Sequence, residues 1–155
     1  MTSAVVVFLD FDGVLHPDPC RRENLFCQLP VVEQVLLEYP KVELVISSSW
    51  RNFHPIQELR LHFSSEFQPR VVGVTPTIEQ SQARWLPGHA PEYQREWECT
   101  EWMAAMRPGG ARWIAVDDCL HWFRPGCADL LVTDRTLGFV AEDATLLRHM
   151  LEERL

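Results

Sequence analysis

The most constraining feature of the sequence is an apolar run, Val5 to Leu9, that ends in two acidic residues, Asp10 and Asp12, followed by Gly13. A continuous run of β-branched and aromatic residues is typical of a strand buried on both faces, as in a parallel sheet. Removing an unpaired carboxylate from water is costly, so such a pair favours a nearby cation. Because ligands bind at the carboxyl ends of strands in open α/β sheets, we expect a metal-assisted site at the end of this strand.

Two further predicted strands also end in polar side chains. The strand from Val42 to Ile46 is followed by three serines, Ser47 to Ser49, and the strand from Trp113 to Val116 is followed by Asp117 and Asp118. Strands that alternate with helices are parallel and are joined by right-handed crossovers, so their carboxyl ends lie on one edge of the sheet. These polar residues are therefore expected to converge on one small site.

The hydrophobic periodicity predicts strands and helices in alternation along the chain. It adds strands over 71–74 and 130–132, and helices over 31–39, from Pro55 onward, over 92–106 and from about 142 to the C-terminus. Residues 13–30 are predicted to form a loop with a short hairpin near 25–27, and residues 75–91 a second loop. The predicted fold class is α/β: one Rossmann-like, three-layer domain over 1–155 with a parallel five-stranded sheet and little or no cap.

The composition bounds the function classes. The chain has 155 residues and a net charge of −8, which argues against broad electrostatic binding to nucleic acid. Its five cysteines form no CxxC pair, so we expect reduced thiols and a cytoplasmic protein. Neither a secretory leader nor an apolar run long enough to span a membrane is expected.

The carboxylates and hydroxyls at the predicted strand ends form a set of hard oxygen ligands, which Mg²⁺ prefers. With the ion bound, one aspartate can attack phosphorus and form an aspartyl-phosphate. The second aspartate, redirected by a turn at Gly13, is placed to protonate the leaving oxygen and later to activate water. A serine can bind the phosphoryl oxygens, and a lysine or arginine can offset their charge.

The same residues resemble motifs of the haloacid dehalogenase (HAD) superfamily of phosphohydrolases. The segment 10–14 resembles its first motif, the serines at 47–49 its second, and the aspartate pair at 117–118 its fourth. More narrowly, the chain resembles the HAD domain of the Swiss-army-knife RNA repair proteins. The segments that carry this resemblance are 12–17, 48–51, Arg95 followed by Glu98 and 102–103, and 133–134 with 138–139.

The resemblance implies roles for the acidic residues. Asp10 would be the nucleophile and a ligand of Mg²⁺. Asp12 would be the general acid and base, with its main-chain carbonyl on the metal. Asp117 and Asp118 would complete the metal site, directly or through water.

The resemblance also implies a phosphate-binding set, in which two assignments stay open. Ser48 would bind the phosphate, with Ser47 as the alternative because the strand end is uncertain by one residue. The family usually has a lysine as its third motif, but the only lysine here is Lys41. Arg95 fits that role by position, and Arg51 competes with it; either can clamp a phosphate. The substrate-binding residues implied are Ser47, Ser49, Arg51 and Gly13.

Other polar and aromatic residues are assigned to structure. His16 is interpreted as a structural histidine, and Asp134 as a residue that holds the last loop. Trp50, Trp102 and Trp113 are expected to pack in the core or at its rim. The helical stripe of Cys99, Trp102, Met103 and Met106 is expected to face the core.

These observations favour a magnesium-dependent phosphatase that hydrolyses phosphate monoesters through an aspartyl-phosphate. Its partner would be a phosphorylated substrate, with a nucleotide or a nucleic-acid end among the candidates, and no membrane or obligate protein partner is expected. One alternative is a receiver-like phosphoacceptor module, which predicts an aspartate after the third strand, where Thr75 and Pro76 stand. Another is a catalytically idle HAD-fold binding protein, which predicts loss of a motif carboxylate. A dehalogenase is less favoured, because Asp12 suits an ester leaving group.

Overall fold

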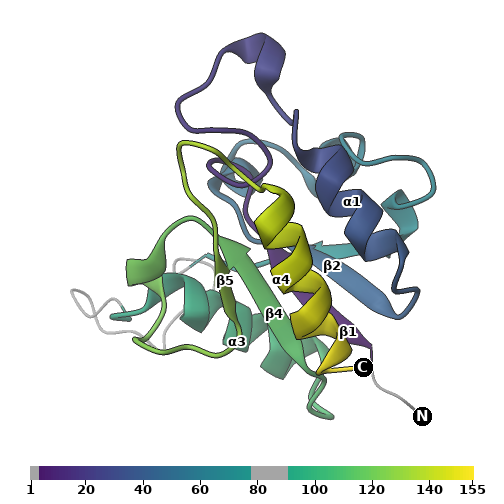
Figure 1. Ribbon diagram of the computed structural model, residues 1–155. Helices are drawn as coiled ribbons and strands as arrows, with labels where there is room; N and C mark the ends of the chain where they lie inside the picture. The colour runs from purple at the N-terminus through teal and green to yellow at the C-terminus, as the bar shows by residue number, and fades with distance from the viewer. Residues whose placement is uncertain (1–3, 78–90) are drawn as a thin grey trace.

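A parallel sheet of five strands forms the centre of the fold (Figure 1). The computed structural model describes residues 4–77 and 91–155. The strand order is β3-β2-β1-β4-β5, and each neighbouring pair is parallel. The strands are β1 (Val5–Leu9), β2 (Val42–Ile46), β3 (Val71–Val74), β4 (Trp113–Asp117) and β5 (Leu130–Val132). The predicted α/β class and parallel five-stranded sheet are confirmed.

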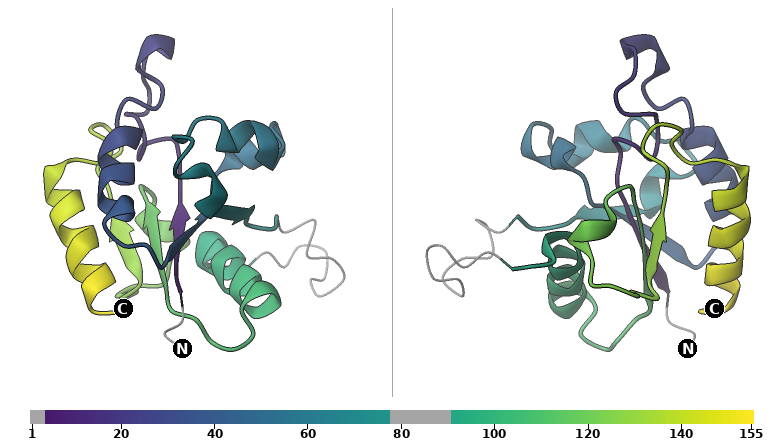
Figure 2. Two further views of the ribbon diagram at one scale, coloured as in Figure 1. Left: turned by 90° about the vertical axis from the view of Figure 1, so that its right-hand side faces the viewer. Right: turned by 60° about the vertical axis from the view of Figure 1, so that its left-hand side comes forward.

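The helices make this a three-layer structure. They are α1 (Leu29–Leu37), α2 (Ile56–Arg60), α3 (Gln94–Met106) and α4 (Ala141–Glu152). Figure 2 shows α1 and α4 on one side of the sheet and α3 on the other. The alternation of β1 explains the two layers: Val5, Val7 and Leu9 pack in the core beneath α1 and α4, whereas Val6 and Phe8 pack against α3. β1 is therefore buried on both faces, as its continuous apolar run predicts.

Several boundaries differ from the sequence prediction. α1 begins at Leu29 rather than 31, because Pro30 lies in its first turn, where the missing N–H costs no hydrogen bond. The hairpin near 25–27 is wrong: a short 3-10 helix (Arg22–Asn24) and tight turns fill this loop, with Cys27 N–H donating to Asn24 O at 3.1 Å. Met106 is 52% exposed rather than in the core stripe, because it is the last residue of α3.

The longest connection among the described residues is the loop over 10–28, between β1 and α1. The link from β1 to α1 contains one short 3-10 helix, and no separate cap lies within 4–77 and 91–155. Most of the loop predicted over 75–91 lies outside the described residues, and the single domain over 1–155 stays a prediction. None of the helices in the described part of the chain is long and apolar enough to cross a membrane.

Candidate active site

Three of the predicted site residues stand at the carboxyl ends of three adjacent strands, β2, β1 and β4. Asp10 directly follows β1, Ser47 directly follows β2, and Asp117 is the last residue of β4. Backbone hydrogen bonds continue the sheet one step beyond the strands: Asp10 N–H donates to Val116 O at 3.0 Å, and Ser47 N–H donates to Leu9 O at 2.9 Å. The positions of these side chains are thus fixed by the register of the sheet.

Three carboxylates form a compact acidic cluster, which consists of Asp10, Asp117 and Asp118. One oxygen from each lies within 4.8 Å of the others. Asp10 and Asp117 are buried, with exposed fractions of 4% and 1%. Burial and then the charge of Asp117 raise the pKa of Asp10 well above its ordinary value. Burial raises the pKa of Asp117 to about 7, against the opposing effect of Arg95.

The acidic cluster fits a hard divalent cation. Buried carboxylates this close together disfavour ionisation unless a positive charge compensates them. An all-oxygen donor set with two or three carboxylates matches the ligand preference of Mg²⁺. Asp10, Asp117 and Asp118 are therefore the residues that would hold the ion, as the sequence predicts for them.

Gly13 allows the loop after β1 to pass close to the acidic cluster. Its φ is +77°, and a Cβ placed on it would lie 2.3 Å from Oδ2 of Asp118. Thr133, which follows β5, donates a hydrogen bond from its hydroxyl to Gly13 O at 2.8 Å. The absence of a side chain at Gly13 therefore leaves the space that the Asp118 carboxylate occupies.

Asp12 lies apart from the acidic cluster. His16 Nε2 lies 2.8 Å from Asp12 Oδ1, and Trp50 Nε1 donates to both carboxylate oxygens at 3.1 and 3.2 Å. The hydrogen bond from His16 is the main cause that lowers the pKa of Asp12. The carboxylate of Asp12 is thus not one of the clustered metal ligands, and the predicted role of its main-chain carbonyl stays a prediction.

His16 and Trp50 have contacts that sequence reasoning missed. Phe26 N–H donates to Nδ1 of His16 at 3.2 Å, so the imidazole proton lies on Nε2, which donates to Asp12. His16 is 1% exposed and is held in this tautomer by the backbone. Its position four residues after Asp12 was the available signal, but only the folded loop shows that the two side chains meet.

Arg95 places a positive charge near the acidic cluster, and this charge opposes the rise in the pKa of Asp10 and of Asp117. It is 5% exposed, and its Nη1 donates to the backbone oxygen and the hydroxyl of Ser47. Burial alone disfavours its charge, but Asp10 and Asp117 hold its pKa above the ordinary value. Arg95 therefore contributes the positive charge that a phosphate would need at this edge.

Arg51, the competing candidate, is engaged elsewhere. Its Nη2 forms an ion pair with Glu98 of α3 at 3.0 Å, and its Nη1 donates to Ser48 O at 2.8 Å. Glu98 is fully buried, and sequence reasoning assigned it no role beyond its place in a motif. The geometry therefore favours Arg95 over Arg51 for the basic third-motif role.

The three serines occupy different environments. Ser47 contacts Arg95, whereas the Ser48 hydroxyl accepts a hydrogen bond from Trp50 N–H at 3.3 Å and caps a short 3-10 helix (Ser49–Asn52). Ser47 and Ser48 are both buried, and Ser49 is exposed. The assignment of the phosphate-binding hydroxyl to Ser48, with Ser47 as its alternative, stays a prediction.

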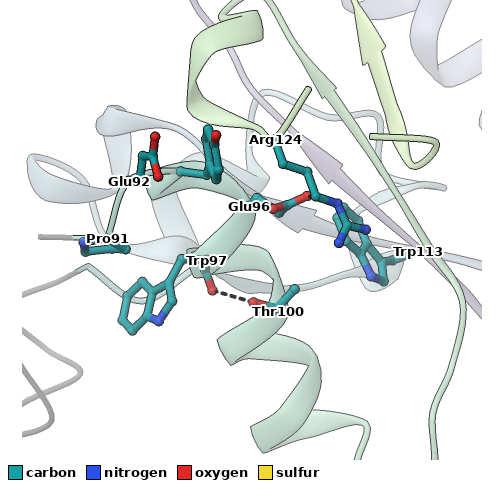
Figure 3. A pocket seen from close by; sticks show the side chains of 8 residues that line it. Pro91, Glu92, Glu96, Trp97, Thr100, Trp113 and Arg124 are labelled. Atoms are coloured by element: carbon teal, nitrogen blue, oxygen red, sulfur yellow. Dashed lines mark hydrogen bonds and ion pairs between the residues drawn. The ribbon is translucent and has the colours of Figure 1, made fainter. Parts of the chain in front are cut away.

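Two pockets flank the sheet edge and α3. One, of about 210 Å³, is lined by Asp12, Ser49, Trp50, Phe53 and His54. A second, of about 290 Å³, lies beside the first turns of α3, where Glu96 pairs with Arg124 at 3.2 Å (Figure 3). Only the first pocket includes a predicted catalytic residue.

A Rossmann-like parallel sheet with an aspartate nucleophile candidate after β1 and clustered carboxylates after β4 defines a HAD-like domain. A family model described as the HAD domain in Swiss Army Knife RNA repair proteins matches residues 6–144, and the chain belongs to that family. No curated protein and no solved structure matches the chain. Family membership supports a phosphatase-type activity.

Proposed function

We propose that this protein is a magnesium-dependent phosphatase that hydrolyses phosphate monoesters through an aspartyl-phosphate on Asp10. The observation that carries the proposal is the acidic cluster, in which Asp10, Asp117 and Asp118 lie within 4.8 Å of one another. The buried Arg95 favours the ionised form of Asp10 through its charge. The proposed site therefore combines a nucleophile, metal ligands and a phosphate-binding cation.

In the first step, an oxygen of Asp10 attacks the phosphorus, and the bond from phosphorus to the leaving oxygen breaks. Asp12 donates a proton to that oxygen, which leaves as an alcohol. In the second step, Asp12 accepts a proton from water, the water oxygen attacks the phosphorus, and Asp10 is released with inorganic phosphate. Bound Mg²⁺ supplies the positive charge that keeps the clustered carboxylates ionised and offsets the charge of the phosphate.

The hydrogen bonds to Asp12 suit both of its roles. In the free protein, His16 and Trp50 favour the carboxylate form, which the second step requires. A phosphate dianion beside Asp12 would raise its pKa, because a nearby negative charge disfavours a second one, and would favour the acid form needed in the first step. His16 and Trp50 also orient the carboxylate.

We further propose that the phosphate is carried by a nucleotide or a nucleic-acid end. The description of the family as a domain of RNA repair proteins supports this substrate class. The net charge of −8 disfavours extended contact with a phosphate backbone, so the protein would act on a chain end rather than along a duplex. We propose a cytoplasmic protein that requires no obligate protein partner.

The test is a phosphatase screen with and without Mg²⁺, using small phosphate esters, nucleotides and phosphorylated oligonucleotides. Asp10→Asn is expected to lower kcat by at least about a thousandfold, because the amide is a poor nucleophile. Asp134→Asn is the matched control, since Asp134 is exposed and its carboxylate accepts hydrogen bonds from the backbone N–H and the hydroxyl of Thr136 within a turn. Full turnover by Asp10→Asn would refute the assignment of the nucleophile.

A further inference from the structure

The pocket lined by Asp12, Ser49, Trp50, Phe53 and His54, here called the aromatic pocket, is not used by the proposed chemistry. We propose that the aromatic pocket binds the base of a nucleoside leaving group by stacking against Phe53 and Trp50. This inference rests on the proposed function, because it assigns a place to the part of the substrate that departs after phosphoryl transfer.

The position of Asp12 determines which part of the substrate reaches the pocket. A general acid must lie within hydrogen-bond distance of the oxygen that it protonates. The leaving oxygen therefore lies beside the carboxylate of Asp12, on the opposite side of the phosphorus from the attacking oxygen of Asp10. Since Asp12 also lines the aromatic pocket, the group attached to the leaving oxygen is directed toward that pocket.

One aromatic wall of the pocket, Trp50, is held in place before any ligand binds. Trp50 is fixed on one side by its hydrogen bonds to Asp12 and on another by ring contacts with Phe26, at 5.2 Å between centroids. The ring of His54 lies 5.5 Å from that of Trp50, at an angle of 30°. A held indole loses little conformational freedom when a ligand stacks on it, which favours binding.

Phe53 is the most unusual wall residue because its side chain lies largely in water. It is 80% exposed, directly after the 3-10 helix Ser49–Asn52. No ring contact to Phe53 is found among the described residues. An exposed aromatic side chain next to a candidate active site is typical of a stacking platform for a nucleic-acid base.

The size and charge of the pocket also fit a base rather than a phosphate. Its volume is about 210 Å³, below the roughly 300 Å³ at which pockets begin to enclose a whole ligand. Among its described lining residues there is no lysine or arginine, and Asp12 is acidic. A small, partly aromatic pocket whose described lining has no lysine or arginine suits one neutral ring, held by stacking that every base can provide.

Binding measurements test the aromatic pocket without any turnover. Asp10→Asn protein with Mg²⁺ would be titrated by calorimetry with a nucleoside 3′-monophosphate, a nucleoside 5′-monophosphate and base-free ribose 5-phosphate. We expect the better nucleotide to bind on the order of tenfold more tightly than ribose phosphate, because stacking of one base contributes this much. Equal binding of nucleotide and ribose phosphate would overturn the proposal.

Substitutions assign the preference to the pocket. In the same background, Phe53→Ala is expected to remove most of the preference for the base, whereas Phe53→Trp keeps it. Leu61→Ala is the matched control, because Leu61 is a 71% exposed apolar side chain that does not line the pocket. An unchanged preference in Phe53→Ala would contradict the role of the pocket.

Oligonucleotides that end in a 3′- or 5′-phosphate distinguish a chain end from a free nucleotide as the source of the base. Tighter binding of either oligonucleotide, still sensitive to Phe53→Ala, would identify a chain end. The phosphatase screen with Asp10→Asn tests the chemistry separately. A wild-type protein that binds nucleotides through Phe53 but hydrolyses none would contradict the proposed function and leave the aromatic pocket established.

Discussion

At the residue scale, Asp10 experiences opposing effects. Burial and the carboxylates of Asp117 and Asp118 act against its ionisation, whereas Arg95 favours it. A nucleophilic carboxylate must be ionised, so burial and the neighbouring carboxylates oppose the role that we propose for Asp10, and Arg95 supports it. A divalent cation bound beside the cluster, as we propose, would act in the same direction as Arg95 and favour the ionised form.

Gly13 gives a prediction at this scale. Gly13→Ala is expected to abolish most activity and weaken Mg²⁺ binding, because the new Cβ would displace the carboxylate of Asp118. The positive φ of +77° is unfavourable for alanine, so the free energy of unfolding is also expected to fall by about 1–2 kcal/mol. Phosphatase assays, Mg²⁺ titration and urea unfolding measure the three effects.

The control is Gly126→Ala. Gly126 has a similar φ of +72°, but a Cβ on it would meet nothing within 4 Å. This variant is expected to lose a similar free energy of unfolding and to keep its activity. Equal activity of the two variants would show that Gly13 does not serve to make room for Asp118.

The sequence predicts some of these residues well and others not at all. Asp10 and Asp117 are predictable because a buried strand fixes where its last side chains point, and both strand ends were located to within one residue. The contacts of His16 and Trp50 with Asp12 depend on the path of loops, which no periodicity encodes. The choice between Arg95 and Arg51 likewise needed the partner of Arg51, Glu98, which lies 47 residues away.

At the scale of elements, α3 contributes two buried charges one turn apart. Arg95 reaches the end of β2, and Glu98 pairs with Arg51 of the 3-10 helix Ser49–Asn52. The exposed side-chain fractions of Arg51 and Glu98 are 7% and 0%. Burial raises the pKa of Glu98 and lowers that of Arg51, so desolvation is the main effect on both groups.

Glu98→Gln is therefore expected to lower the free energy of unfolding by about 3 kcal/mol, because it leaves the buried Arg51 without a compensating charge. Urea unfolding measures the change. Glu38→Gln provides the comparison, since its ion pair with Arg148 lies at the surface, with exposed fractions of 43% and 34%. A loss in Glu98→Gln no greater than in Glu38→Gln would show that the Arg51–Glu98 pair does not hold α3 to the sheet edge.

The bounds of a strand were predictable where its apolar side chains give way to a polar residue, whereas the end of the buried face of a helix was not. β2 and β5 have the predicted bounds, because apolar runs stop abruptly at polar residues. Met106 continues the apolar stripe of α3 in sequence, yet it is the last residue of the helix and its side chain is exposed. Periodicity indicates a face of a helix but not where along that face burial ends.

At the scale of the whole molecule, the acidic cluster makes the stability of the fold depend on pH. Asp117 has an ordinary pKa of 3.8 and a pKa of about 7 in the folded protein. Between about pH 4 and pH 7 the folded state holds a proton that the unfolded state has lost, so the contribution of Asp117 to stability falls as pH rises through this window. Above about pH 7 both states are ionised, and the contribution is constant.

If Mg²⁺ binds the ionised cluster, as we propose, its stabilising effect is expected to grow as pH rises through about 7. Thermal unfolding at pH 5.5 and pH 8, with and without Mg²⁺, measures this: the rise in Tm should be larger at pH 8. Asp117→Asn should remove most of that difference, whereas Asp134→Asn should keep it. A rise in Tm that is equal at both pH values in the wild type would contradict the proposed coupling.

The placement of the chain ends has a practical consequence. β1 begins and α4 ends at the border of the sheet away from the acidic cluster (Figures 1 and 2). Arg112 forms hydrogen bonds with both segments: its backbone oxygen accepts from Val6 N–H, and its Nη1 donates to Arg154 O. A tether attached at either end would therefore leave the opposite rim facing outward. Immobilisation on a surface, or fusion to another module, should preserve access for the nucleic-acid end that we propose as a substrate.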